Sequence, residues 1–257
     1  MKVMSKIKMC LASKYNNCSG GISGEHYISK SILNLSSIDD KVEICGLPWI
    51  KPNTFEKIGI NSLTANILCT KHNNDLSIYD NEILKLYKAF AEIDNHFNKS
   101  CFLDVNEIKI DGNKIEKWML KTCLGLIASK QISKNDKREE LVIKDFYLDI
   151  LFNDKKISDN CGLYFKIPKN RWISKHNGFS FIPQTANCEL KAAEFWINNF
   201  AFNFIIEKPN IPNEVDIYRI NKITFKTAND IKSIILDWDN NIYNRSIEML
   251  LSIKSES

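Results

Sequence analysis

The sequence predicts an α+β protein in two parts, an N-terminal metal-binding segment and a C-terminal part that is first helical and then rich in strands. Three observations support this fold class. Potential metal ligands gather before residue 73, apolar residues keep helical spacing between Leu76 and Ile93, and short β-like runs recur after Cys161. Helical spacing and alternation are the main sequence signals of the two kinds of element. The polar run after residue 93 marks the boundary, which gives domains 1–98 and 99–257.

The composition is that of a soluble globular protein. Hydrophobic residues make up 44% and charged residues 26% of the 257 residues, which is enough for one large domain or two modest ones. No apolar stretch is long enough to cross a bilayer, and the N-terminal lysines precede no apolar core of signal-peptide length. We therefore expect a cytoplasmic protein without a membrane partner. The net charge of +4 suits a polyanion such as nucleic acid, although many other proteins share it.

The eight cysteines indicate a metal site more than a disulfide framework, because nothing in the sequence indicates secretion. The four that follow residue 100 are isolated in apolar surroundings typical of small core residues. Among the others, Cys10 pairs with Cys18, and Cys69 pairs with His72 in a C-x-x-H spacing that lets two ligands reach one ion. Zinc would give this loop-rich segment folding energy. The alternative is unrelated thiols and a surface histidine.

The rest of the N-terminal part combines loops with one long helix. Residues 1–24 are expected to form an irregular loop around CSGGISG. Residues 36–63 are expected to be loop-like, since the prolines and glycine of GLPWIKP exclude a continuous helix. A long amphipathic helix is predicted from residues 70–74 to the polar run before residue 99. Its apolar positions are Leu76, Tyr79, Ile83, Leu86, Tyr87, Phe90 and Ile93.

The C-terminal part has recognisable elements but no nameable motif. A strand is predicted over 102–110, followed by an Asp-Gly turn, and two amphipathic helices are predicted over 115–130 and 140–152. Asn177-Gly178 is typical of a hairpin turn. The β-like runs cover 162–167, 178–182, 193–197, 200–206, 216–225 and 233–238. Tryptophans inside these apolar patterns are expected in the core; they are Trp118, Trp172, Trp196 and Trp238.

An acid-histidine pair follows the Gly/Ser-rich turn. Glu25 and His26 lie in GEHYIS, where a lone histidine would more often be a satisfied strand-end residue. The second segment, LCTKHN, changes this interpretation, because it places Asn73 directly after two potential zinc ligands at a helix start. The two segments together favour a functional role for the acid-histidine pair over the strand-end interpretation.

These segments resemble the HNH, or His-Me finger (ββα-metal), endonuclease family. That family combines a Cys pair, an acid-His dipeptide on the first strand, a variable loop, and L-C-x-x-C-H at the start of a helix. Here CLASKYNNC supplies the Cys pair, GEHYIS supplies the acid-His dipeptide, and ILCTKHN supplies the last segment. In that last segment His72 takes the place of the second cysteine of the family pattern. The resemblance covers residues 10–80 and implies that the N-terminal domain is a zinc-stabilised ββα-metal nuclease module.

The resemblance also implies a role for each matching residue. His26 would be the general base that takes a proton from the attacking water, since imidazole titrates near neutral pH. Glu25 and Asn73 would hold a catalytic divalent ion, Mg²⁺ or Mn²⁺, through hard oxygen ligands. That ion would neutralise charge on the scissile phosphate and the leaving oxygen. Asn66 would orient the base, and the zinc would be structural.

Two features of the sequence depart from the family pattern or leave alternatives open. Asn66 is closer to Cys69 than the middle asparagine of the family, and Asn61 is farther away, so we assign the orienting role to Asn66. Asp80 lies two turns after Asn73 on the same helix face and could support the metal site, but we interpret it as a solvated acid.

A further alternative concerns the zinc ligands and the function. His72 could serve the catalytic ion instead, and Cys45 would then complete the zinc site. The first functional hypothesis is a metal-dependent endonuclease that hydrolyses DNA, in host defence or a mobile element. The second is an inactive, zinc-stabilised module that binds nucleic acid or protein, which would not need Glu25 and His26. The C-terminal domain is expected to bind substrate or a protein partner, by analogy alone.

Overall fold

The computed structural model describes residues 10–51, 54–99, 107–134, 137–138, 140–167, 178–207, 216–226, 231–239 and 244–250. The chain divides into two compact units that interleave along the sequence. The first comprises Met1–Asn81, Lys117–Ile157 and Thr185–Leu190, and the second comprises Glu82–Glu116, Ser158–Gln184 and Lys191–Ser257. These units divide the chain differently from the predicted domains 1–98 and 99–257, because helices α2 (Thr70–Lys99) and α3 (Gly112–Ala128) each contribute to both.

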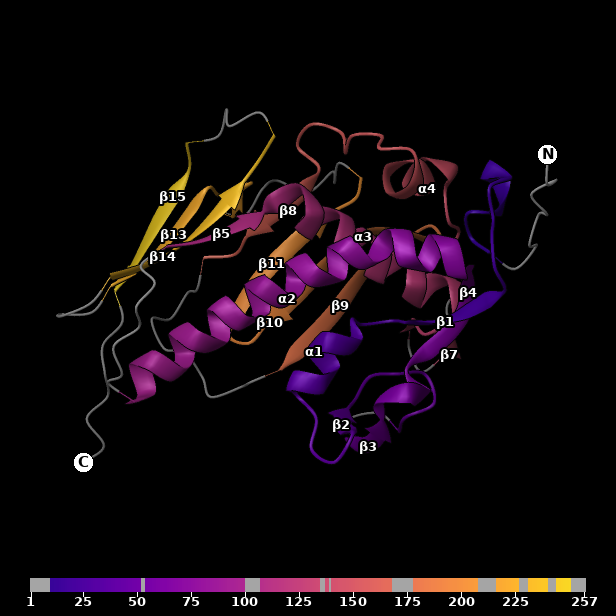
Figure 1. Cartoon of the computed structure of the whole chain (residues 1–257), viewed down its shortest axis with the longest axis horizontal. Helices are drawn as coiled ribbons and strands as arrows, with labels where there is room; N and C mark the ends of the chain where they lie inside the picture. The colour runs from indigo at the N-terminus through magenta and orange to yellow at the C-terminus, as the bar shows by residue number, and fades with distance from the viewer. Residues whose placement is uncertain are drawn as a thin grey trace. The chain divides into compact units, whose positions relative to one another are not determined.

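The first unit contains a strand pair that leads directly into a helix. Strand β1 (Ile22–His26) pairs antiparallel with β4 (Thr64–Cys69), and His26 lies opposite Thr64. Helix α2 begins at Thr70 without an intervening loop. The three elements form a ββα arrangement, which Figure 1 shows in indigo to magenta.

The segment between β1 and β4 is more ordered than the predicted loop over 36–63. It contains an antiparallel pair of short strands, β2 (Lys41–Ile44) and β3 (Glu56–Gly59), which lie before and after the GLPWIKP segment. Proline is incompatible with a helix interior, but it leaves the extended chain on either side free to pair. The other short elements of this unit are η1 (Ser13–Tyr15), α1 (Lys30–Leu35), η2 (Ile60–Ser62), β6 (Ser133–Lys134), β7 (Lys137–Arg138) and α4 (Asp145–Phe152).

The long helices carry much of the core. Every apolar position predicted along α2, from Leu76 to Ile93, is buried, so the prediction from helical spacing is confirmed. Trp118 and Cys123 on α3 are fully buried, as expected. The helix predicted over 140–152 begins only at Asp145, so the prediction was wrong for its first five residues. Within the described ranges, no helix is long and apolar enough to span a membrane.

The second unit is built on two sheets. A five-stranded sheet has the order β12-β8-β11-β10-β9, and a four-stranded sheet has the order β15-β13-β14-β5. In the smaller sheet, β13 pairs antiparallel with β14, while the two outer pairings are parallel. The strands are β5 (Glu107–Asp111), β8 (Gly162–Phe165), β9 (Phe179–Ala186), β10 (Glu189–Ile197), β11 (Phe200–Ile205), β12 (Ile217–Tyr218), β13 (Lys222–Lys226), β14 (Ile231–Asp237) and β15 (Ser246–Leu250).

Phenylalanines fill the core of this second unit. Phe90 of α2 stacks on Phe200 of β11 at 4.3 Å between ring centroids, and Phe225 of β13 meets both rings edge-on. Offset and edge-on aromatic pairs add to the stabilisation from apolar burial alone. Trp238 is also buried, as predicted, and donates its indole N–H to the Ile220 carbonyl at 3.0 Å.

Three predictions for this part of the chain are corrected. Trp196 is 36% exposed, because alternation along β10 places it on the outer face of the sheet. Cys188 is exposed in the turn between β9 and β10, where it adopts a positive φ of 57°. Gly112 starts α3 directly and makes no separate turn, since the Asp111 side chain caps the helix by accepting the Lys114 N–H at 3.0 Å. Trp172, Asn177 and Cys101 lie outside the described residues.

Candidate functional site

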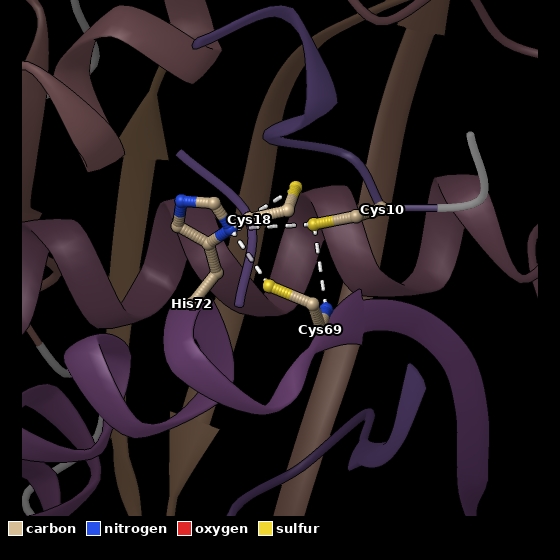
Figure 2. Close-up of side chains that lie close together, drawn as sticks. All are labelled: Cys10, Cys18, Cys69 and His72. Atoms are coloured by element: carbon tan, nitrogen blue, oxygen red, sulfur yellow. Dashed lines mark hydrogen bonds between the residues drawn. The ribbon is translucent and has the colours of Figure 1, made fainter. Parts of the chain in front are cut away.

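Three cysteines and one histidine converge where β4 meets the start of α2. Cys10 and Cys18 flank η1, Cys69 ends β4, and His72 lies in the first turn of α2. All four side chains are buried, and their ligand atoms lie within 4.8 Å of one another. Figure 2 shows the three thiols and the imidazole pointing toward one centre. We call these residues the Cys₃His cluster; the sequence predicted its members.

The spacing of the ligand atoms fits a zinc ion. The Nδ1 atom of His72 lies 3.1 Å from the sulfur of Cys69, 3.4 Å from that of Cys10 and 3.9 Å from that of Cys18. A tetrahedral zinc ion with ordinary bond lengths would hold a sulfur and a nitrogen about 3.5 Å apart. The observed distances lie around this value, so small movements would complete the shell. The cluster could therefore bind a structural metal such as zinc.

Backbone contacts hold the Cys10–Cys18 loop against the strand and helix. The Leu11 N–H donates to the Ile67 carbonyl at 2.9 Å, and the Cys69 N–H donates to the sulfur of Cys10 at 3.3 Å. Gly20 has a φ of +74°, and a Cβ there would lie 2.9 Å from the Cβ of Thr70. The chain therefore needs glycine to return from the loop into β1. This turn explains how a cysteine pair wider than the usual knuckle can present both thiols.

The thiols differ in how easily they lose a proton. Burial raises the pKa of Cys10 to about 11. Burial also acts to raise the pKa of Cys69, but hydrogen bonds from the backbone N–H groups of His72 and Ser19 outweigh it and lower that pKa. Because zinc binds thiolates, metal binding at this cluster would displace protons and strengthen as the pH rises.

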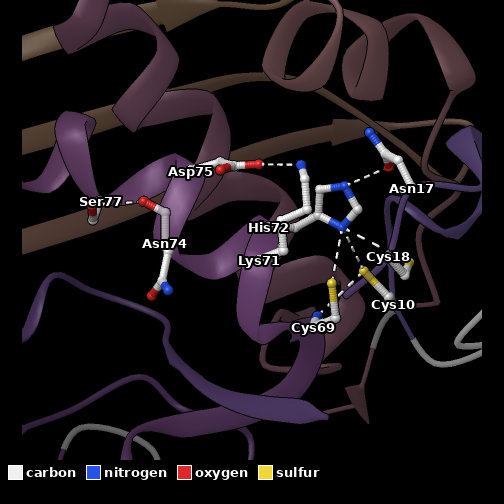
Figure 3. Close-up of polar contacts among 9 residues, drawn as sticks. All are labelled: Cys10, Asn17, Cys18, Cys69, Lys71, His72, Asn74, Asp75 and Ser77. Carbon is white, nitrogen blue, oxygen red and sulfur yellow. Dashed lines mark hydrogen bonds and ion pairs between the residues drawn. The ribbon is translucent and has the colours of Figure 1, made fainter. Parts of the chain in front are cut away.

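Asn17 fixes the orientation of the histidine. Its Oδ1 atom lies 2.8 Å from Nε2 of His72, on the opposite edge of the ring from the sulfurs (Figure 3). An Nε2–H group donating to this oxygen leaves Nδ1 unprotonated toward the thiols. Phe152 packs edge-on against the same ring, with the centroids 5.3 Å apart. Burial and the nearby Lys71 lower the pKa of His72, which favours the neutral form that binds metal.

These contacts show which of the two expected metal sites includes His72. It belongs to the Cys₃His cluster, and Cys45 is exposed and not part of it. Asn17 was not predicted from the sequence. An amide side chain inside the cysteine loop could have indicated a hydrogen-bond partner for the histidine.

Glu25 and Asp80 meet a lysine that the sequence analysis did not identify. The Nζ atom of Lys121, on α3, lies 2.6 Å from Oε1 of Glu25 and 2.5 Å from Oδ2 of Asp80. Asp80 also accepts a hydrogen bond from the hydroxyl of Ser29. The interpretation of Asp80 as a solvated acid was therefore wrong, because Lys121 of α3 and Ser29 both contact its carboxylate. We call Glu25, Asp80 and Lys121 the Lys121 cluster.

His26 lies next to this cluster at the end of β1. It lines a cavity of about 10 Å³ with Glu25 and Lys121, surrounded by apolar side chains, which is room for about one water molecule. The Nε2 atom of His26 is buried and has no hydrogen-bond partner in the part of the chain that the structure describes. Burial, with Lys30 and Lys121 nearby, lowers the pKa of His26. The imidazole is therefore neutral near pH 7 and able to accept a proton.

The two asparagines of the predicted site have other neighbours. Asn73 donates its side-chain N–H to the hydroxyl of Ser23 at 2.8 Å. Asn66 is exposed on β4, and no hydrogen bond between it and His26 is present among the described residues. The structure thus brings together the four predicted zinc ligands, and it places Glu25 against Lys121 instead of Asn73.

The expected catalytic ion fits this arrangement poorly. Its two proposed ligands were Glu25 and Asn73, yet an ammonium group contacts the first and a hydroxyl contacts the second. Divalent ions such as Mg²⁺ need several converging oxygen ligands, and only the Cys₃His group has metal-site spacing among the described residues.

Comparisons with known protein families, curated proteins and solved structures find no match to this chain. The geometry of the two clusters is therefore the basis for a functional assignment.

Proposed function

We propose that the first unit is a nuclease of the HNH, or His-Me finger, type that hydrolyses phosphodiester bonds in DNA. One observation carries the proposal. Strand β1 pairs with β4, which leads directly into α2. The Cys₃His cluster lies where β4 meets α2, and His26 lies at the end of β1. This combination matches the order and the chemistry of the motifs from which the resemblance was drawn. A role in host defence or a mobile element would suit such an activity.

Zinc at the Cys₃His cluster would be structural. Four protein ligands leave no open position for water or substrate, which is the arrangement of structural zinc sites. A bound ion would hold the Cys10–Cys18 loop, the end of β4 and the start of α2 together. It would thereby fix the strand pair on which His26 is carried.

His26 is the residue to which we assign proton transfer. A general base must be unprotonated at the working pH, and burial lowers the pKa of His26. Its ring would take the proton of the water that attacks the phosphate. A catalytic Mg²⁺ or Mn²⁺ ion was expected from the resemblance, but we assign it no step because its proposed ligands do not converge.

The test is cleavage of supercoiled plasmid by the zinc-loaded full chain, with Mg²⁺ or Mn²⁺ present. We expect the wild type to nick or linearise the plasmid and His26→Ala to lose at least about 100-fold in rate, the low end of the contribution of a general base. His96→Ala is the matched control, because the proposal gives this histidine no role. Equal cleavage by wild type and His26→Ala at equal zinc content would disprove the assignment.

The second candidate is an inactive zinc-stabilised module that binds nucleic acid or protein. It is favoured by the same contacts that argue against a catalytic ion, since Lys121 contacts Glu25 and Ser23 contacts Asn73. A gel-shift assay on the same DNA separates the two candidates. Retardation of DNA without cleavage, unchanged in His26→Ala, would support the binding module.

A further inference from the structure

Lys121 lies between two carboxylates from different elements. Glu25 comes from β1, Asp80 from α2 and Lys121 from α3, and the ammonium lies 2.6 Å and 2.5 Å from the two acids. The side chains of Lys121 and Glu25 are 7% and 6% exposed, and that of Asp80 is 25% exposed. The three charges are thus largely removed from water, and the positive charge is shared by two negative ones.

The positions of these groups are fixed by further contacts. The hydroxyl of Ser29 donates to Asp80 and accepts the indole N–H of Trp118 at 2.8 Å. Trp118 is fully buried and precedes Lys121 by one turn of α3. The same helix therefore supplies the ammonium directly and supports its second acid through Ser29. Such a connected network costs more to rearrange than an isolated surface ion pair.

Two carboxylates that contact the same cation could also supply part of the oxygen shell of a hard divalent ion. Mg²⁺ and Mn²⁺ prefer carboxylate oxygens, and two acids that share one positive partner supply them. An ammonium already fills this position, and a second cation placed beside it would be repelled at short range in a poorly solvated region.

We infer that Lys121 is an internal cation that takes the place of a divalent ion between Glu25 and Asp80. Glu25 then acts as a positioning residue that fixes the end of β1, and with it His26, and does not serve as a metal ligand. Glu25 is thereby removed from the ligands expected for a catalytic ion, whether or not the protein is a nuclease. Any binding of divalent ions to the zinc-loaded wild type should therefore not depend on Glu25.

Titration of the zinc-loaded full chain with Mn²⁺, followed by electron paramagnetic resonance, tests the inference. We expect Glu25→Gln to bind Mn²⁺ as the wild type does, whether that binding is measurable or absent. Lys121→Met frees both acids and should gain a Mn²⁺ site at least about tenfold tighter than any in the wild type, because the repelling charge is gone. The double variant Lys121→Met with Glu25→Gln should lose the gained site.

Lys117→Met is the matched control. It removes an ammonium from the same helix whose partner, Asp154, is 91% exposed, so it should gain no Mn²⁺ site. A weaker Mn²⁺ affinity in Glu25→Gln than in the wild type would overturn the inference, and this comparison holds even if Lys121→Met does not fold. A folded Lys121→Met without a new site would also overturn it. Failure of plasmid cleavage would count against the nuclease proposal alone.

Discussion

The Nε2 atom of His72 lies 2.8 Å from Oδ1 of Asn17, while Nδ1 of the same ring faces the three cysteine sulfurs. One edge of the imidazole is therefore held by an amide from the cysteine loop, and the other edge is presented to a metal (Figure 3). The contact links two segments that are 55 residues apart in the sequence. In a metal-loaded cluster, Asn17 would support the ligand histidine without being a ligand itself.

The first prediction concerns this contact. Asn17→Ala should lower zinc affinity by about 10-fold to 100-fold, because loss of an outer-shell partner leaves the ligand histidine free to change tautomer and orientation. Competition with a chromophoric chelator on the full chain measures this change. Asn17→Asp keeps an acceptor oxygen and should retain at least the affinity of the wild type. Equal affinity of Asn17→Ala and wild type would show that Asn17 has no such role.

The second prediction concerns the cysteine that joins strand and helix. Cys69→Ser should lose zinc, since it removes a thiolate whose sulfur lies 3.1 Å from the ligand nitrogen of His72. Metal analysis after dialysis measures the stoichiometry, and thermal unfolding reports the accompanying loss of stability. Cys45→Ser, which alters an exposed thiol, and His26→Ala should both keep one zinc per chain. Zinc retained by Cys69→Ser would contradict the proposed ligand set.

The sequence predicted the Cys₃His cluster because its members lie in short motifs. The C-x-x-H spacing is local, so helix geometry alone brings Cys69 and His72 together. The Lys121 cluster was missed for the opposite reason. Lys121 is 41 residues from Asp80 along the chain, and periodicity shows which face of a helix is apolar but not which element covers a given acid.

A similar limit applies to the fold. Helix α2 was predicted accurately because its apolar positions repeat over many turns. The short strands β2 and β3 were not predicted, since each has only four residues and depends on its partner for hydrogen bonds. The interleaved units could not be predicted either. A boundary drawn in the sequence assigns each helix to one domain, whereas α2 and α3 each contribute residues to both units.

The third prediction concerns a buried ion pair in the second unit. Arg219 contacts both carboxylate oxygens of Glu116 at 2.9 Å and 3.0 Å, and the Leu163 N–H donates to the same group at 2.8 Å. The Glu116 side chain is 2% exposed. Glu116→Gln should lower the free energy of unfolding by about 3–5 kcal/mol, because a guanidinium that is largely removed from water loses its carboxylate. Urea denaturation measures the change.

The control for this prediction is another glutamate of the same unit. Glu107 pairs with Lys222 at 2.9 Å, but both side chains are about half exposed, so Glu107→Gln should have little effect on stability. Replacing Glu116 and Arg219 together by leucine and methionine should recover part of the loss, since no charge is then left buried without a partner. A loss for Glu116→Gln no larger than that for Glu107→Gln would show that the pair contributes little.

The fourth prediction concerns the pH dependence of stability. Burial lowers the pKa of His26 below its ordinary value of 6.5, so the folded state binds fewer protons than the unfolded state below that pH. The contribution of neutral His26 to stability is complete above pH 6.5 and is lost as the pH falls toward the lowered pKa. His26→Gln removes this group, so its stability should fall less than that of the wild type between about pH 7.5 and about pH 5.5.

Urea denaturation of both proteins at the two pH values measures this difference. In zinc-loaded protein, protonation of the Cys₃His cluster would also weaken the fold in acid. Both proteins share this cluster, so its contribution cancels in the comparison. A steeper loss in His26→Gln than in the wild type, or an equal one, would mean that His26 is not held in its neutral form by folding. The same lowered pKa predicts that any cleavage by His26 stays at full rate until the pH falls below 6.5, because only the neutral imidazole accepts a proton.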